Sequence, residues 1–304
     1  MTRLLIGLLL ALASFEAGAQ GDGPRNWQLV PDDSRSVTIY GIAVRGNQSG
    51  DFSTIVSGAE VDATIGVLQY TRAFAVGGKQ LQAFASVPFG RIHGTAPGPG
   101  GARSATSSGL GDATFGALYG LIGSPALHDK EYAAYAPGFT LGALAKMSAP
   151  TGEYDSSSPV NLGTNRWSLQ LGMPMVRYFG RSFADSALGS LELTPSLQVF
   201  SNNNAPRSGN TVRQAPLFKL EGHATRNVSR PLWFSADAFL ARGGETTTDG
   251  VSNNNPQRWL SLGASAGFNF SDTVSGSLSY GKVVRRNDGG LDMRGLRADA
   301  IISF

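Results

Sequence analysis

The amino-acid sequence predicts an all-β fold, and more closely a transmembrane antiparallel β-barrel of about 12 strands with short turns at one end and long loops at the other. Three observations predict it. Segments of about ten residues alternate between apolar and polar side chains. The connections between these segments alternate between short and long along the chain. The last such segment, residues 296–304, alternates up to the final residue, Phe304, so its backbone is expected to pair with neighbouring strands.

The first residues predict export from the cytoplasm. Arg3 precedes an apolar run, residues 4–13, and the tripeptide at residues 17–19 has the small-x-small form of a signal-peptidase site. The run is too short to cross a bilayer as a helix, and Gln20 rather than a cysteine follows the expected cut, so no lipid anchor is indicated. We therefore expect residues 1–19 to be a signal peptide.

The composition favours strands and excludes several classes of protein. The chain has no cysteine, so its stability has to come from size, strand pairing or a membrane rather than from disulfides. A net charge of +3 is too weak to indicate a nucleic-acid partner. Glycine is abundant, at 40 residues, and no later segment has the apolar length of a membrane helix. An exported, glycine-rich and helix-poor chain is expected to be built from β-strands.

Twelve segments show the alternation or the turn signals of a strand. Between residues 139 and 147, for example, Phe139, Leu141 and Ala143 alternate with Thr140 and Gly142. In chain order the candidate strands begin near Val37, Val61, Lys79, Gly109, Pro137, Thr164, Gly189, Pro216, Pro231, Gln257, Thr273 and Leu291.

The connections differ by side, as in a bacterial outer-membrane barrel. Tight connections are expected at residues 77–79, 227–231 and 270–273, and two longer ones on the same side at residues 122–136 and 180–188. Long connections rich in Gly, Ser, Asn and Pro are expected at residues 46–60, 91–108, 149–163, 201–215 and 243–256.

Lipid requires such a sheet to close. No backbone N–H or C=O group can be left unpaired in hydrocarbon, so the last strand is expected to pair with the first, near residues 39–44. The ring of Phe304 would then lie at the periplasmic interface. A C-terminal aromatic residue also resembles the signal that the barrel-assembly machinery recognises in outer-membrane proteins. A soluble β-sandwich or propeller is the rival interpretation, but its wet face should carry more charge than the 15% present.

Alternation assigns the two faces of the wall. Apolar residues at 260–270 and 232–240 are expected to face lipid, where a Lys or Arg at mid-depth costs about 2 to 4 kcal/mol. Charged residues on the opposite face are therefore predicted to line the lumen. They are Lys146, Glu192, Lys219, Glu221, His223, Asp237, Arg297 and Asp299.

The middle of the chain carries a motif pattern that resembles the MetA-pathway of phenol degradation family of outer-membrane transporters. The resemblance implies a barrel related to those that take up aromatic or other hydrophobic compounds. An alternative, structural interpretation is that the glycines free strand ends, that Pro150 and Gly152 form a turn, and that Trp167 anchors the membrane interface. The motif residues are Gly109, Gly111, Asp112, Pro150, Gly152, Asn161, Gly163, Asn165 and Trp167.

No catalytic residue, metal or cofactor is expected. Residues 263–267 match the G-x-S-x-G form around Ser265, but they lie inside an alternating strand rather than at the strand-to-helix turn that a nucleophile elbow needs. The histidines at 93, 128 and 223 are scattered, and no metal motif is present. An outer-membrane esterase or phospholipase ranks third among the functions considered.

The leading functional prediction is passive transport of a small hydrophobic or aromatic molecule, and the second is a closed structural or surface-interaction barrel. Residues 20–36 are not obviously a strand, and we expect them to be a periplasmic segment or a plug that folds into the lumen of a barrel formed by residues 37–304. Arginines expected at the outer rim would either attract anionic substrates or contact lipopolysaccharide phosphates. They are Arg91, Arg103, Arg207, Arg213, Arg242, Arg258, Arg285, Arg286 and Arg294.

Overall fold

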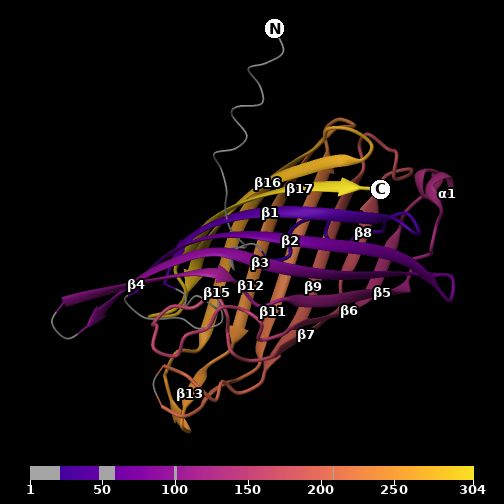
Figure 1. The fold of residues 1–304 in the computed structure, drawn as a ribbon. Coiled ribbons are helices and arrows are strands. Elements are labelled where there is room, and N and C mark those ends of the chain that lie inside the picture. The colour runs from indigo at the N-terminus through magenta and orange to yellow at the C-terminus, as the bar shows by residue number, and fades with distance from the viewer. Residues whose placement is uncertain (1–20, 48–58, 99–100, 208) are drawn as a thin grey trace.

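The structure is a computed structural model that describes residues 21–47, 59–98, 101–207 and 209–304 (Figure 1). The expected signal peptide, Gln20 and most of the 46–60 connection lie outside these residues. Within them, no helix has both the length and the apolar character that crossing a membrane would require.

The described residues form a sheet of 14 strands, a small sheet of three strands and one short helix, α1 (Asp129–Ala134). The large sheet contains β1 (Arg35–Gly46), β2 (Glu60–Val76), β3 (Lys79–Gly98), β4 (Gly101–Leu110), β5 (Thr114–Ile122), β6 (Phe139–Ser148), β7 (Ser168–Gly172), β8 (Met175–Phe179), β9 (Gly189–Phe200), β11 (Leu217–Asn227), β12 (Leu232–Gly243), β15 (Gln257–Asn269), β16 (Val274–Arg286) and β17 (Met293–Ser303). The small sheet contains β10 (Val212–Gln214), β13 (Thr246–Thr248) and β14 (Val251–Ser252).

The large sheet closes on itself, which confirms the predicted antiparallel barrel. Strand β1 pairs with β17 from Ser36 opposite Ser303 to Gly46 opposite Met293. The ladder continues past the strand ends, because Phe304 and Arg35 exchange both backbone hydrogen bonds, at 2.9 and 3.2 Å. Since β4 with β5, and β7 with β8, each form one interrupted strand of the wall, the barrel has the predicted 12 strands.

The two ends of the barrel differ as the connections predict. The short turns, the C-terminus and α1 lie together at one end, which we call the short-turn end (Figure 1). The small sheet, the end of β3 at Gly98 and the start of β4 at Gly101 lie at the other, the long-loop end (Figure 1). Two expectations were incomplete. Residues 91–98 and 101–108 do not form a loop but continue the β3–β4 ladder to Gly98 opposite Gly101, and α1 was not predicted within the 122–136 connection.

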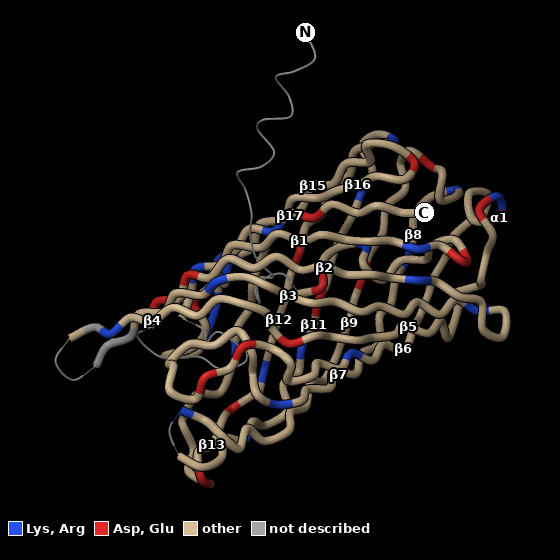
Figure 2. Tube along the Cα trace, viewed as in Figure 1, with Lys and Arg blue, Asp and Glu red and all other residues tan. Residues whose placement is uncertain are grey.

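Large apolar side chains cover the outside of the barrel, as expected of a wall in lipid. They alternate with buried residues along each strand, so that on β12 Phe234 is exposed while Trp233 and Ser235 are buried. Lys and Arg (blue) and Asp and Glu (red) gather toward the barrel ends in Figure 2. Exposed members of the outer belt include Ile39, Leu68, Val87, Phe115, Leu171, Leu191, Leu262, Leu278 and Ile302.

The interior is not uniformly polar. Toward the long-loop end, buried side chains of β1, β2, β3, β11, β12, β15, β16 and β17 form one apolar cluster with residues of the 149–167 connection. Ile42 and Ile92 are fully buried in this cluster, and the rings of Phe239 and Trp259 stack at 5.1 Å between centroids. The charged side chains that alternation places inside therefore lie between this apolar cluster and the short-turn end, rather than along the whole lumen.

Candidate functional site

Residues 21–34, here called the N-terminal segment, run inside the barrel from the short-turn end. Two tyrosines hold the base of the segment at Leu29, which is buried: the Leu29 N–H donates to Tyr178 Oη at 3.1 Å, and Tyr132 Oη donates to the Leu29 carbonyl at 3.0 Å. Burial raises the pKa of the Tyr132 hydroxyl, so it remains a donor at neutral pH. The base is thus fixed both by the wall and by α1.

The middle of the segment is bound by Glu192 of β9. The Arg25 backbone N–H donates to Glu192 Oε2 at 2.9 Å, and Gln28 Nε2 donates to Glu192 Oε1 at 2.7 Å. The Arg25 guanidinium donates to Asn227 Oδ1 at 2.7 Å and lies over the Trp233 ring at 4.5 Å from its centroid. Burial lowers the pKa of Arg25 to about 10, which still leaves its side chain charged at neutral pH.

The tip of the segment is held by Glu221 and by cations of the wall. The N–H groups of Asp22 and Gly23 donate to the Glu221 carboxylate at 3.0 and 2.7 Å, and the Asp22 carboxylate lies 2.5 Å from Lys146 Nζ. Burial favours a raised pKa for Asp22, but the positive charge of Lys146, followed by Lys219 and Arg297, lowers it below the ordinary 3.8. Gly23 has φ +95°, and a Cβ there would overlap the Arg297 guanidinium.

Glu221 also belongs to a buried chain of polar groups behind the tip. His223 contacts Glu221 Oε1 with Nε2 at 2.8 Å and Asp237 Oδ1 with Nδ1 at 2.6 Å. Ser265 Oγ donates to Asp237 Oδ2 at 2.6 Å, within the uninterrupted strand β15. Since both histidine nitrogens contact carboxylates, His223 does not contact Ser265 as the base of a nucleophilic serine would.

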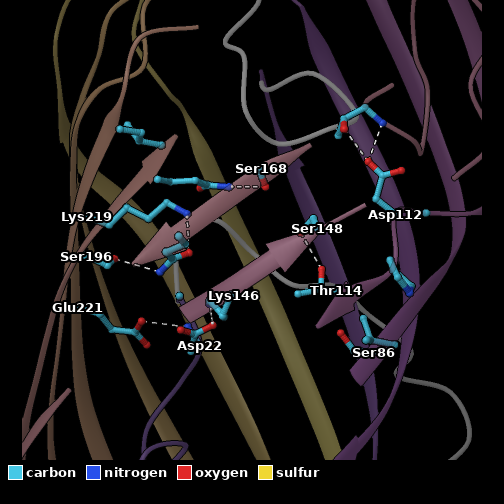
Figure 3. Close-up of a pocket in the computed structure, with 18 of the residues that line it drawn as sticks. Asp22, Ser86, Asp112, Thr114, Lys146, Ser148, Ser168, Ser196, Lys219 and Glu221 are labelled. Carbon is cyan, nitrogen blue, oxygen red and sulfur yellow. Dashed lines mark hydrogen bonds and ion pairs between the residues drawn. The ribbon is translucent and has the colours of Figure 1, made fainter. Parts of the chain in front are cut away.

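A cavity of about 330 Å³ lies between the tip of the segment and the apolar cluster. Figure 3 shows Asp22, Lys146 and Glu221 together at one part of its wall and Lys219 nearby. Neighbouring strands β5, β6, β7 and β9 contribute hydroxyl and amide groups, which bond one another, as Thr114 does with Ser148 at 2.8 Å. Six aromatic side chains also line the cavity: Trp27, Tyr40, Phe84, Phe200, Phe239 and Trp259.

Several motif residues meet at one junction of the wall beside this cavity, where β4 gives way to β5. The buried Asp112 carboxylate accepts three hydrogen bonds, from Gly152 N at 2.9 Å, Thr164 N at 2.9 Å and Thr164 Oγ1 at 2.6 Å. The backbones approach closely, because a Cβ at Gly152 would lie 2.6 Å from Gly111 and one at Gly163 would lie 2.7 Å from Gly152. The Asp112 carboxylate thus accepts hydrogen bonds from backbone N–H groups of the 149–167 connection, which does not pair with a strand at this point.

The other motif residues lie around this junction. Asn161 accepts from the Asp155 N–H at 2.8 Å, and Asn165 donates to Asn203 Oδ1 at 2.9 Å with φ +53°. Gly109 has φ +143°, Pro150 is exposed beside the turn at 149–151, and the Trp167 side chain is exposed. Thr164 is not among the predicted site residues, although it provides two of the three donors to Asp112.

Of the eight residues predicted to line the lumen, Lys146, Lys219 and Glu221 line the cavity. Glu192, Glu221, His223, Asp237 and Arg297 are buried, and Lys146 pairs with Asp22. Lys219 donates to Gln170 at 3.4 Å, and Asp299, half-buried, accepts from Ser277. Alternation did not indicate Tyr132 and Tyr178, whose contacts depend on the path of the N-terminal segment.

A closed 12-stranded barrel with an apolar belt outside and charged groups inside defines an integral β-barrel protein of the bacterial outer membrane. Residues 44–290 match the family described as MetA-pathway of phenol degradation, and the chain belongs to that family. This confirms the resemblance drawn from residues 109–180.

Solved structures show the same fold. The COG4313 outer membrane channel from Pseudomonas putida F1 is 19% identical, with a TM-score of 0.75 over 92% of this chain and 99% of that one. The β domain of the Bordetella autotransporter BrkA is 14% identical, with a TM-score of 0.50 over 90% of this chain and 100% of that one. Among curated proteins, no sequence matches this chain.

Proposed function

We propose that the protein is an outer-membrane channel for the passive uptake of small hydrophobic or aromatic molecules. The observation that carries the proposal is the cavity of about 330 Å³ with six aromatic side chains inside a closed barrel. Its volume is near the lower limit of small-molecule sites, which are about 300 to 1,000 Å³. The family, and the channel named among the similar structures, support the same function.

In this proposal the N-terminal segment is the plug of the channel. It contacts the wall at its base, middle and tip, through Tyr178, Glu192 and Glu221. Transport then requires the segment to move, while the charged lumen residues shape the path and none of them is catalytic. The partners would be outer-membrane lipid and lipopolysaccharide outside, the assembly machinery at Phe304, and the small-molecule substrate inside.

Liposome swelling with solutes of graded size and polarity tests the proposal. Small aromatic solutes should enter vesicles that contain the protein faster than vesicles without it, and uptake should fall as solute size increases. A closed structural barrel is the second candidate, and the filled lumen at the short-turn end favours it. That barrel would admit none of the solutes, so an absence of swelling for the whole series would reject the channel.

Removing single charges beside the cavity should change ion selectivity. Lys219→Ala removes a cation from the lumen and is expected to shift selectivity toward cations, whereas Glu221→Ala is expected to shift it toward anions. Reversal potentials in planar bilayers under a salt gradient measure both shifts. Arg45→Ala with Asp62→Ala is the matched control, because this exposed pair, 2.5 Å apart, faces outward. Equal reversal potentials in all variants would show that Lys219 and Glu221 do not line the conducting path.

A further inference from the structure

Asp22, at the tip of the N-terminal segment, places a carboxylate among the cations of the cavity wall. Its Oδ1 atom is 2.5 Å from Lys146 Nζ, and the two side chains are only 14% and 16% exposed. Lys219 and Arg297 are close enough to lower its pKa further. Asp22, Lys146 and Lys219 all line the cavity (Figure 3).

The wall's own carboxylates near the cavity are already occupied. Glu221 binds two backbone N–H groups of the segment and His223, and Asp112 accepts three hydrogen bonds from the 149–167 connection. Asp299 accepts from Ser277 on the neighbouring strand. The Asp22 carboxylate at Lys146, by contrast, is supplied by the segment and not by a strand, so it leaves when the segment moves.

The rest of the cavity suits an aromatic ring. Trp27 and Phe84 lie 5.8 Å apart between ring centroids, and Lys146 Nζ lies 5.9 Å from the Trp27 ring. The buried Trp27 Nε1 has no hydrogen-bond partner among the described residues. Hydroxyl groups of Thr114, Ser148 and Ser196, which bond neighbouring side chains, also line the cavity.

We propose, resting on the proposed channel function, that the cavity binds aromatic carboxylates and that Asp22 occupies the position of the ligand's carboxylate in the closed state. A bound aromatic carboxylate replaces Asp22 at Lys146, and the tip of the segment is released. A neutral aromatic molecule cannot make this exchange, because it brings no carboxylate to replace that of Asp22 beside the Lys146 ammonium. Asp22 thus acts as a tethered competitor of the substrate.

Binding measurements on the folded, detergent-solubilised protein test this exchange with benzoate and benzyl alcohol as matched probes. Isothermal titration should show tighter binding of benzoate than of benzyl alcohol. Asp22→Asn removes the competing charge and should tighten benzoate binding by about tenfold, the scale of one charge-assisted hydrogen bond, with little effect on benzyl alcohol. Lys146→Met should remove the preference for benzoate. Asp33→Asn is the control, because its carboxylate pairs with Arg72 and is 72% exposed.

The outcomes separate this inference from the channel function. Equal affinities for the two probes, or an Asp22→Asn variant that binds benzoate no more tightly than the parent, would overturn the tethered-competitor proposal even if Lys146→Met fails to fold. Liposomes containing the protein that take up benzyl alcohol and benzoate at the same rate would also overturn it, while supporting the channel. If neither probe enters, the proposed function fails together with the inference.

Discussion

Deleting residues 21–34 is expected to raise single-channel conductance from near zero to a resolved open level in planar bilayers. The segment is bound to the inner wall at three levels, through Leu29, through Arg25 with Gln28, and through its tip, and in our proposal it is the plug. A 12-stranded barrel is intermediate in width between eight-stranded barrels, which side chains fill, and larger porins, which are open channels. Whether its lumen conducts therefore depends on the residues that lie inside it. Removing the occupant therefore has a larger effect than any substitution in the wall.

The deletion leaves the closure of the barrel intact, because the β1–β17 ladder begins at Arg35 and Ser36. Heat-modifiable migration on SDS gels should confirm that the variant is folded before its conductance is measured. Glu192→Gln is a milder variant. It weakens the hydrogen bonds from Arg25 and Gln28 without removing the segment, and it should produce brief channel openings. A folded deletion variant that conducts no better than the parent would show that the segment is not the barrier.

Local patterns were sufficient to predict the barrel, and they also assign a face to each side chain of its strands. In a strand the side-chain period of two fixes the face of each residue, so Lys219, Glu221 and His223 had to share one face and lipid excluded the outer one. Phe304 likewise indicated a final strand with partners, and it pairs with Arg35. These predictions needed only sequence neighbours and the polarity of the surroundings.

Contacts between distant segments could not be read from the same patterns. Tyr178 lies 149 residues from Leu29 in the chain, and nothing in the alternation of β8 distinguishes it as an anchor of the N-terminal segment. The apolar cluster toward the long-loop end was not predicted, for a related reason. The local sequence of a strand does not show whether its lumen face is covered by other side chains or faces water. The continued β3–β4 ladder was missed because its small polar residues resemble those of a loop.

Replacing Asp112 by alanine is expected to lower the free energy of unfolding by about 3 kcal/mol, because the buried carboxylate is the acceptor for three donors of the 149–167 connection. Thr164 Oγ1 also lies 3.0 Å from the Arg166 carbonyl, so its hydroxyl can donate there when the carboxylate is lost. The N–H groups of Gly152 and Thr164 have no such second acceptor in the described hydrogen bonds. Denaturant unfolding in detergent or lipid measures the difference.

Asp155→Ala is the matched control, since Asp155 is an exposed carboxylate of the same connection. It bonds mainly to Ser157, two residues away, and its loss should cost less than about 1 kcal/mol. Asp112→Asn should be almost as damaging as the alanine variant, because an amide keeps one acceptor oxygen and presents its NH2 group to the N–H donors on the other side. If Asp112→Ala is no less stable than Asp155→Ala, the junction is held by the close packing of Gly111, Gly152 and Gly163 rather than by the carboxylate.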